Sequence, residues 1–260
     1  MVQETCISNL EQSMTWLNNF GRILVIAPHP DDEILGVGGT IARLARAGSE
    51  TFVAVVTTGQ LPDYSAAETA RVRAEATQAH ALLGVEEILW LDLPAARLGE
   101  VSHAARNAAL TKIVKQVQPT TLFLPFAGDI HIDHQMTFLS AMVAARPHQA
   151  TYPGTILAYE TLSETNWNAP YLSPAFVPNV FVDITDTLEV KLEAMRMYKS
   201  QLRAFPHERS VEALRALATL RGATVHRPAA EAFVLVRHVV FFDPTHREVG
   251  SEHMAATYSR

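Results

Sequence analysis

The sequence has little cysteine and no long apolar run, and both absences narrow what the protein can be. Its only cysteine is Cys6, so no disulfide can form within the chain, and a reducing compartment is favoured. Residues 1–21 carry acids and asparagines where a secretory signal would be apolar. The longest apolar runs elsewhere have the length of a strand and are too short to span a membrane. We therefore expect a cytoplasmic protein with no membrane partner.

Positive charge is also scarce. The chain has 21 Lys and Arg against 27 Asp and Glu, which gives a net charge of −6. This balance offers no overall attraction to nucleic-acid phosphates, so we expect no nucleic-acid partner and a small molecule as substrate. The hydrophobic share of 48 % and the charged share of 18 % suit a globular protein. They leave open whether it forms a homo-oligomer.

What the sequence does contain is a regular alternation of apolar runs and helical patterns. Residues 23–27 form a continuous apolar run, typical of a strand buried on both faces. The apolar spacing over 34–47 predicts a helix that ends at Gly48. Further strands are predicted at 51–57, 88–91, 121–125, 155–159, 177–182 and 232–240, and further helices at 66–83, 103–117, from near 131, 188–202 and 211–221.

Buried strands that alternate with helices imply right-handed crossovers and a mainly parallel sheet. The predicted fold class is α/β, a Rossmann-like three-layer α/β/α sandwich with a C-terminal elaboration. We expect one domain over residues 1–260, with a core at about 22–160 and the elaboration at about 161–245. Ligands of such folds collect at the carboxyl ends of the strands. Polar residues that directly follow a strand are therefore the first candidates for function.

One polar cluster, residues 29–33, follows the first strand and reads His-Pro-Asp-Asp-Glu. Crowded carboxylates raise one another's pKa values unless a cation neutralises them. His29 and Asp32 are three residues apart, so a turn into a helix lets both face one point and supply two ligands of a zinc-type site. Asp31 would be rotated away from that point but stay near it. Alternatively, the acids cap the next helix and offset its dipole.

A second cluster follows the fourth strand and contains His131 and His134. Residues three apart are neighbours on one helical face, and His134 could complete a His-Asp-His site. Three protein ligands leave a fourth position for water, which is the catalytic pattern of zinc sites. Either histidine could instead be solvated at the start of a helix. Two such clusters, each directly after a buried strand, favour the metal site over these alternatives.

The two motifs, together with glycines in the intervening helix, resemble the PIG-L/LmbE-like family of zinc-dependent N-deacetylases, which remove N-acyl groups from amino sugars and their conjugates. Weaker similarities extend over most of residues 22–240. They comprise the glycines Gly36, Gly38 and Gly39, Arg73 with Glu75, Leu83 with Gly84, residues 182–184, Lys191, Tyr198, Gln201 and residues 230–233.

The resemblance implies roles for six residues. The implied ligands of Zn²⁺ are His29, Asp32 and His134. Asp31 would be the general base, His131 would stabilise the oxyanion or protonate the leaving amine, and Asp133 would orient a histidine. Amide hydrolysis needs these functions, because zinc activates water and polarises the carbonyl, a carboxylate takes the proton, and another group offsets the developing charge. Two histidines and an aspartate would also accept Fe²⁺, Co²⁺ or Mn²⁺.

The substrate side departs from the family pattern. The family commonly has an acid in a turn after the third strand, whereas this chain has Ala95 and Ala96 there, and Asp92 lies three residues too early. The residues of the catalytic centre are intact, so this departure concerns the recognition of substrate. The effect of the missing acid is therefore an open question.

Three other residues are candidates for substrate binding. Arg71 and Arg73 could bind a phosphate or a sugar hydroxyl, or could instead be solvated or paired within their helix. Trp167 lies in a polar excursion and is the best candidate for an aromatic that contacts substrate. The leading hypothesis is removal of an N-acetyl or other N-acyl group from an amino sugar or its conjugate. The alternatives are hydrolysis of a different small amide and a non-catalytic metal-binding module.

Overall fold

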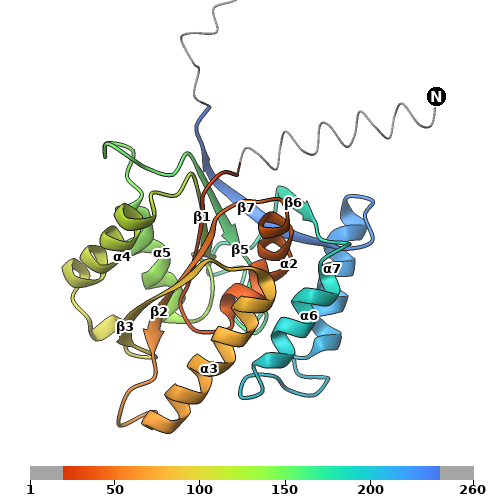
Figure 1. Cartoon of the computed structure of the whole chain (residues 1–260), viewed down its shortest axis with the longest axis horizontal. Helices are drawn as coiled ribbons and strands as arrows, with labels where there is room; N and C mark the ends of the chain where they lie inside the picture. The colour runs from red at the N-terminus through yellow and green to blue at the C-terminus, as the bar shows by residue number, and fades with distance from the viewer. Residues whose placement is uncertain (1–19, 241–260) are drawn as a thin grey trace, which may run out of the picture.

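The computed structural model describes residues 20–240, so Cys6 and all but the last two of residues 1–21, in which no secretory signal was found, lie outside that range. One sheet divides these residues into three layers (Figure 1). Its strands are β1 (Ile23–Ala27), β2 (Thr51–Thr58), β3 (Glu87–Pro94), β4 (Thr121–Pro125), β5 (Thr155–Tyr159), β6 (Val180–Asp183) and β7 (Ala230–His238). The helices are α2 (Asp32–Arg46), α3 (Ala66–Leu83), α4 (His103–Val117), α5 (Ile132–Ala144), α6 (Leu188–Met197) and α7 (Val211–Thr224), with a short 3₁₀ turn η1 (Leu98–Glu100).

The continuous apolar run of β1 serves two cores, one on each face of the sheet. Because side chains alternate along a strand, Ile23 and Val25 pack beneath α2, α3, α6 and α7, while Leu24 and Ile26 pack against α4 and α5. All four side chains are fully buried. Figure 1 shows the same division, with the sheet between the two groups of helices. The predicted three-layer α/β/α fold is confirmed.

The sheet order β3-β2-β1-β4-β5-β7-β6 determines where a site can form. β1 pairs in parallel with β2 on one side and with β4 on the other. The chain therefore winds in opposite directions from β1 and β4, and a crevice opens between the loops at their carboxyl ends. Both predicted polar clusters follow these two strands. Only β7 runs antiparallel, to β5 and to β6, so the sheet is mainly parallel as expected.

Several predicted boundaries in the C-terminal part differ from the structure. α7 ends at Thr224 and not at 221, and β7 spans Ala230–His238 and not 232–240. Two further differences have a clear cause. The strand expected from Val177 begins at Val180, because Pro178 has no N–H to donate and Asn179 instead accepts the Leu235 N–H through its side chain. The helix expected to reach residue 202 ends at Met197, since Tyr198 leaves the helical conformation with ψ 62°. The Tyr198 hydroxyl donates to Glu33 at 2.8 Å, and this contact holds the residue toward the core.

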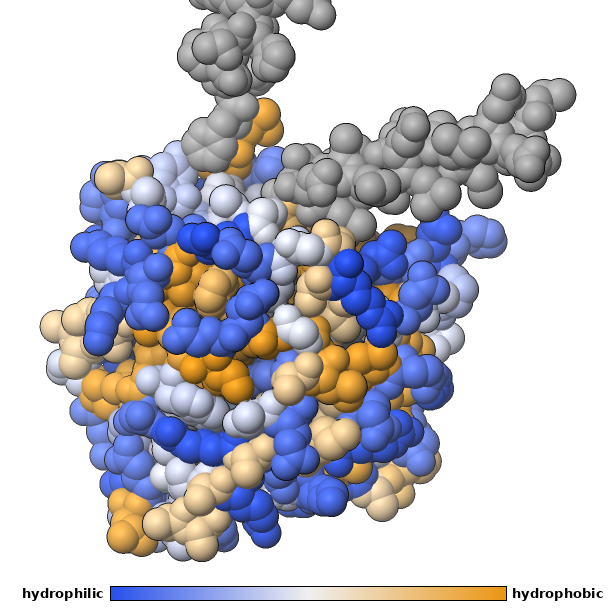
Figure 2. Space-filling view, viewed as in Figure 1, coloured by the Kyte–Doolittle hydropathy of each residue, from blue (hydrophilic) through white to orange (hydrophobic). Residues whose placement is uncertain are grey.

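The surface shows no continuous apolar band on the face viewed in Figure 2, where apolar side chains gather in separate patches among hydrophilic ones. Among residues 20–240, no helix is both long and apolar enough to cross a membrane.

The glycines of α2 allow close packing under the C-terminal elaboration. A Cβ at Gly39 would lie 2.7 Å from Cδ1 of Ile184 and 2.9 Å from its Cβ. Alanine is the better helix former, but these contacts are too short to be relieved without backbone movement. We predict that Gly39→Ala lowers the free energy of unfolding by about 1–3 kcal/mol, measured by urea denaturation.

Gly99→Ala is the matched control, because a Cβ there meets only Ile132, at 4.0 Å. Equal stability of the two variants would contradict the predicted overpacking at Gly39.

Candidate active site

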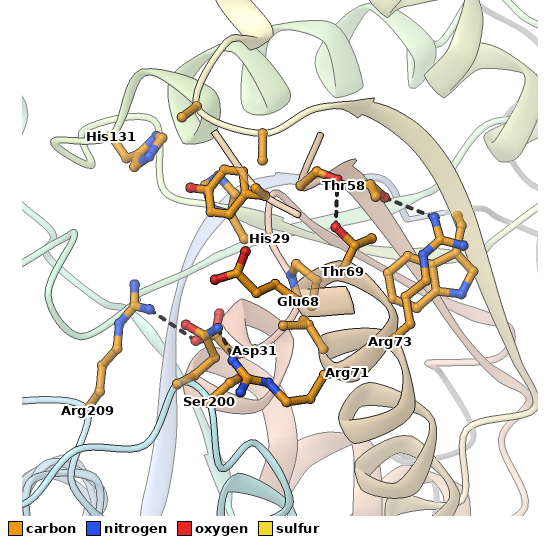
Figure 3. Close-up of a pocket in the computed structure, with 18 of the residues that line it drawn as sticks. His29, Asp31, Thr58, Glu68, Thr69, Arg71, Arg73, His131, Ser200 and Arg209 are labelled. Carbon is orange, nitrogen blue, oxygen red and sulfur yellow. Dashed lines mark hydrogen bonds and ion pairs between the residues drawn. The ribbon is translucent and has the colours of Figure 1, made fainter. Parts of the chain in front are cut away.

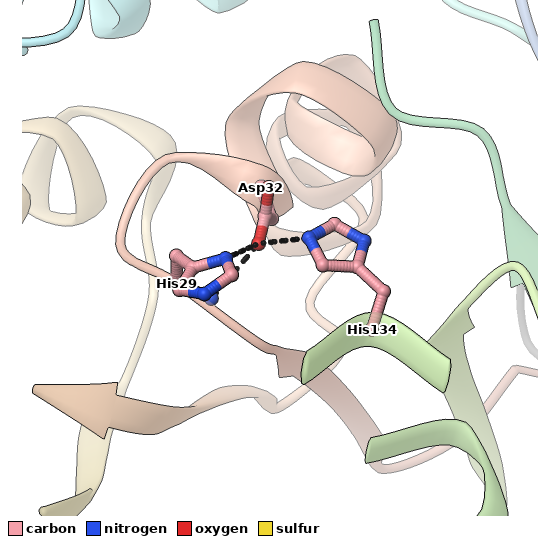
Figure 4. A group of neighbouring side chains, drawn as sticks. All are labelled: His29, Asp32 and His134. Carbon is pink, nitrogen blue, oxygen red and sulfur yellow. Dashed lines mark hydrogen bonds and ion pairs between the residues drawn. The ribbon is translucent and has the colours of Figure 1, made fainter. Parts of the chain in front are cut away.

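Three side chains from the segments that follow β1 and β4 converge in the crevice between these strands. His29 lies in the loop after β1, Asp32 begins α2, and His134 lies in the first turn of α5. Oδ2 of Asp32 is 3.2 Å from Nδ1 of His29 and 3.2 Å from Nε2 of His134 (Figure 4). The structure thus brings together the residues that the sequence predicted as ligands.

This group of side chains fits a divalent cation. Oδ1 of Asp32 and Nε2 of His134 are buried without a hydrogen-bond partner among the described residues. A buried polar atom left unpaired costs about 1–3 kcal/mol. His29, Asp32 and His134 each offer a ligand atom within 4.8 Å of the others, and imidazole nitrogens with a carboxylate oxygen are suitable donors for zinc. A cation at this point would satisfy the unpaired atoms.

Each histidine of this group also contacts a second carboxylate. His29 has its Nε2 3.1 Å from Oδ2 of Asp133, and His134 has its Nδ1 2.8 Å from Oδ2 of Asp129. Such outer carboxylates fix the tautomer and the orientation of a ligating imidazole. The expected contact of Asp133 with a histidine is therefore present, and the histidine is His29. Asp129 holds His134 and also accepts the Thr165 hydroxyl at 2.6 Å.

Asp133 also anchors the turn in which the family's substrate-side acid is missing. Its Oδ2 accepts the Ala96 N–H at 2.7 Å, and its Oδ1 accepts the Leu98 N–H at 3.1 Å. Ala96 adopts a left-handed conformation with φ 61°. One carboxylate therefore fixes both His29 and the backbone of the 96–98 turn.

The pKa values of the group reflect one buried carboxylate between two imidazoles. Burial favours neutral Asp32, but His134 and His29 outweigh it and hold the pKa of Asp32 well below its ordinary value. Burial lowers the pKa of His134, but Asp32 and Asp129 outweigh it and raise that pKa to about 10. In the same way, burial lowers the pKa of His29, while hydrogen bonds with Asp133 and Asp32 raise it to about 9. The group of His29, Asp32 and His134 thus favours a positive charge beside the Asp32 carboxylate.

Asp31 occupies the N-cap position of α2 but does not cap the helix. Its side chain makes no capping hydrogen bond, and its backbone has φ 119°, a strained value for a residue with a Cβ. The Asp31 N–H donates to Oε2 of Glu33 at 3.2 Å. Burial raises the pKa of the Asp31 carboxyl to about 7, against the opposing effect of the Arg209 guanidinium. The side chain lines a cavity beside the group of ligands.

Arg209 is the main partner of Asp31, and sequence reasoning missed it. Its Nη1 lies 3.2 Å from Oδ2 of Asp31, and its Nη2 lies 3.2 Å from Oε1 of Glu164 (Figure 3). Nε donates to the Ser163 hydroxyl at 3.0 Å. Arg209 follows no strand, and it is 178 residues from Asp31 in sequence, so no local pattern indicates the pairing.

His131 is the N-cap residue of α5, and this position determines its tautomer. Its Nδ1 accepts the backbone N–H of Asp133 at 3.0 Å, so in the neutral ring the proton lies on Nε2. Burial lowers the pKa of His131 to about 4, with further lowering from His29 and His134. His131 lines the same cavity as Asp31 (Figure 3). It therefore offers the cavity a neutral N–H donor.

Glu33, the third acid of the first motif, faces away from the cavity. Its Oε1 accepts the Tyr198 hydroxyl at 2.8 Å and lies 2.8 Å from Nε2 of His80. All three side chains are buried. His80 is therefore a core histidine with a carboxylate partner.

The cavity measures about 430 Å³ and is bounded by α3 on one side. Arg73 lines it, but its guanidinium is bound to Asp92 and to Thr58, and stacks over Trp90 at 4.4 Å. Arg73 therefore pairs with Asp92, the acid of β3 that lies three residues before the family position. It does not pair with an acid of its own helix. Arg71 also lines the cavity, and its side chain makes no hydrogen bond or ion pair with another described residue. Trp167 lies outside, in an adjoining hollow.

Comparisons with known proteins identify the family of this chain. A model of the family described as PIG-L: GlcNAc-PI de-N-acetylase matches residues 24–145. A diacetylchitobiose deacetylase from Thermococcus kodakarensis is 31% identical over 201 residues, which cover 74% of this chain and 73% of that protein.

Two solved structures share the fold over most of their length. The conserved protein TT1542 from Thermus thermophilus superposes with a TM-score of 0.70 at 26% identity and covers 87% of this chain and 99% of its own. The N,N'-diacetylchitobiose deacetylase from Pyrococcus horikoshii, complexed with its inhibitor MPG, gives a TM-score of 0.66 at 28% identity, with 90% and 92% covered. With both histidine motifs inside the matched region, the resemblance seen in the sequence is confirmed, and the chain belongs to the PIG-L family.

Proposed function

We propose that this protein is a metal-dependent hydrolase that removes an N-acetyl or other N-acyl group from an amino sugar or an amino-sugar conjugate. The observation that carries the proposal is the convergence of His29, Asp32 and His134 beside a cavity that Asp31 and His131 also line. The family and the deacetylases among its relatives support the same reaction. A purely structural metal site has no need of a base beside its ligands, which disfavours a non-catalytic module.

We propose Zn²⁺ as the resident cation, held by His29, Asp32 and His134, with Fe²⁺ or Co²⁺ as alternatives of suitable ligand chemistry. When bound, the cation would act as a Lewis acid that activates water and polarises the acyl carbonyl. Asp129 and Asp133 would keep the two imidazoles in the orientation that binding requires.

Asp31 is the proposed general base. Its Oδ2 is bonded to Arg209, whereas its Oδ1 has no hydrogen-bond partner within residues 20–240, and the side chain lines the cavity. Oδ1 can therefore take a proton from the attacking water and return it to the leaving amine. Arg209 holds the carboxylate in place and favours its ionised form between turnovers.

His131 is the proposed donor to the oxyanion of the tetrahedral intermediate. Because its Nδ1 accepts a backbone N–H, the neutral ring carries its proton on Nε2 and can donate it as a hydrogen bond. Of the two roles that the resemblance implied for His131, this contact favours oxyanion stabilisation over protonation of the amine.

His131 and His134, the two histidines of the second motif, should differ in function. We predict that His134→Ala loses metal, because a direct ligand is removed, while His131→Ala keeps metal and lowers kcat by about 10²–10³-fold, the usual effect of removing one oxyanion donor. Metal content by elemental analysis, amine release from N-acetylated sugars and a thermal melt of both variants would measure this.

His29→Ala should lose metal as His134→Ala does. If wild-type protein purified without chelator holds no metal, or if His131→Ala is the variant that loses it, the assignment of ligands is wrong.

Asp31→Asn should retain metal and fold but hydrolyse substrate about 10²–10⁴-fold more slowly, the usual scale of general acid–base catalysis. The amide preserves the shape of the side chain but cannot take a proton. The assay should include simple N-acyl amides beside N-acetylated sugars, because Ala95 and Ala96 leave the recognition of the sugar open. Turnover near the wild-type rate would assign the base to another residue, with Asp133 the next candidate.

Asp133→Ala should weaken metal binding by about 10–100-fold, the usual cost of losing a carboxylate behind a ligating histidine. The variant also releases the Ala96 and Leu98 N–H groups. Asp129→Ala serves as a second test, because it leaves these groups paired and removes the contacts with His134 and Thr165 instead. Competition titration with a chromogenic chelator measures both.

Glu193→Ala, which removes an exposed partner of Arg196, is the control for loss of an acid. Affinities of Asp133→Ala and Asp129→Ala equal to that of Glu193→Ala would count against the supporting role of both carboxylates.

A further inference from the structure

A second hollow of about 180 Å³ adjoins the catalytic cavity. The two share four lining residues: Glu164, Gln201, Arg203 and Arg209. Arg209, which bonds Asp31, therefore stands between the reacting centre and the hollow. A ligand too large for the cavity would extend across this boundary into the hollow.

The far side of the hollow is formed by Trp167 with His207. The Trp167 side chain is 54% exposed, although a large aromatic ring gains by burial. Its ring centroid is 6.2 Å from that of His207, with the rings inclined at 63°, so the indole is not stacked against the imidazole in parallel. An exposed aromatic surface beside a catalytic cavity is typical of a ligand-binding site.

The turn that carries Trp167 is held rigidly on both sides. Asn166 accepts the Ser163 N–H at 3.0 Å and donates to Glu208, while Asn168 donates to the carbonyl of Gly128. Thr165 donates to Asp129, which holds His134. The indole is thus fixed relative to the metal-site loop, and a ligand that stacks on it would meet a preorganised surface.

The near side of the hollow offers polar groups instead of further apolar surface. Arg203 donates to the carbonyls of Ser200 and Leu202 and has no carboxylate within ion-pair distance among residues 20–240. Gln201 donates to the Ser200 hydroxyl, and its amide oxygen has no donor within the described part of the chain. A sugar ring has an apolar face and a rim of hydroxyls, and this hollow presents an aromatic face and a polar rim.

We propose that the hollow is a second saccharide subsite, and that the substrate is an N-acylated amino sugar linked to at least one further sugar ring, which stacks on Trp167. The inference rests on the proposed function, because it takes the cavity as the place where the N-acyl sugar is hydrolysed. The proposal adds that residues 163–167 and 201–209, on the C-terminal side of the cavity, determine how many sugar rings the preferred substrate contains.

Hydrolysis of N-acetylglucosamine and of N,N′-diacetylchitobiose by the metal-loaded protein tests the subsite. The measured quantity is the ratio of kcat/KM for the disaccharide to kcat/KM for the monosaccharide. We expect Trp167→Ala to lower this ratio about tenfold, as loss of one aromatic contact of about 1.4 kcal/mol would. Trp167→Phe should keep most of the ratio, because it retains an aromatic face.

Tyr171→Ala is the matched control, since Tyr171 is an aromatic of the same excursion that is 84% exposed and lies outside both the cavity and the hollow. It should leave the ratio unchanged. An equal ratio in wild type, Trp167→Ala and Tyr171→Ala would overturn the subsite while leaving the deacylase activity established.

A binding measurement separates failure of the subsite from failure of the proposed function. Isothermal titration of both sugars into Asp31→Asn, with and without Trp167→Ala, needs no turnover. Tighter binding of the disaccharide that is lost with Trp167→Ala supports the subsite, even if no protein releases amine and the proposed reaction is therefore wrong. Equal affinity for the two sugars in Asp31→Asn overturns the subsite.

Discussion

The buried carboxylate of Asp32 is the group on which the arrangement of this site depends. An ionised acid without solvent is costly unless opposite charge and hydrogen bonds surround it. Here its Oδ2 lies between two imidazoles, and each imidazole has its other nitrogen on a further acid. Asp129 and Asp133 thus extend the compensation outward, to Thr165 on one side and to the backbone of the 96–98 turn on the other.

Neutralising the charge of Asp32 in this way requires that two segments distant in sequence meet. The sheet topology brings them together. β1 and β4 are neighbours at the point where the strand order reverses, so the loop bearing His29 and the first turn of α5, which bears His134, meet in the same crevice. The strands themselves are buried on both faces and carry no polar side chain toward the site. The sheet supplies a rigid frame, while the segments that follow β1 and β4 supply the chemistry.

Much of the fold and the convergence of the three ligands could be predicted from local sequence patterns. The strands at 23–27, 121–125 and 155–159 and the helices at 66–83 and 103–117 match the structure to the residue, because continuous apolar runs and Gly or Pro boundaries are strong local signals. The convergence of His29, Asp32 and His134 followed from their positions after parallel strands. The family resemblance supplied their proposed roles.

The partners supplied by irregular segments could not be predicted. Arg209 lies in the loop between α6 and α7, and Thr165 lies in the excursion after β5, where neither periodicity nor spacing constrains the path of the chain. The early end of α6 depends on the contact between Tyr198 and Glu33, a tertiary interaction that overrides helical propensity. The acids and bases of the site thus follow from strand order, but the side chains that hold them follow only from packing.

The contacts of Asp133 separate the support of the catalytic centre from the recognition of substrate, two properties that are often coupled in enzymes. It holds the turn after β3 through the main-chain N–H groups of Ala96 and Leu98, and every residue except proline carries such a group. Positions 95 and 96 line the cavity. The side chain at 95 can therefore change without disturbing the support of His29, and position 96 can accept any side chain that tolerates its left-handed backbone. New specificities could arise, by natural drift or in a designed library, from substitutions in this turn that leave the reacting centre intact.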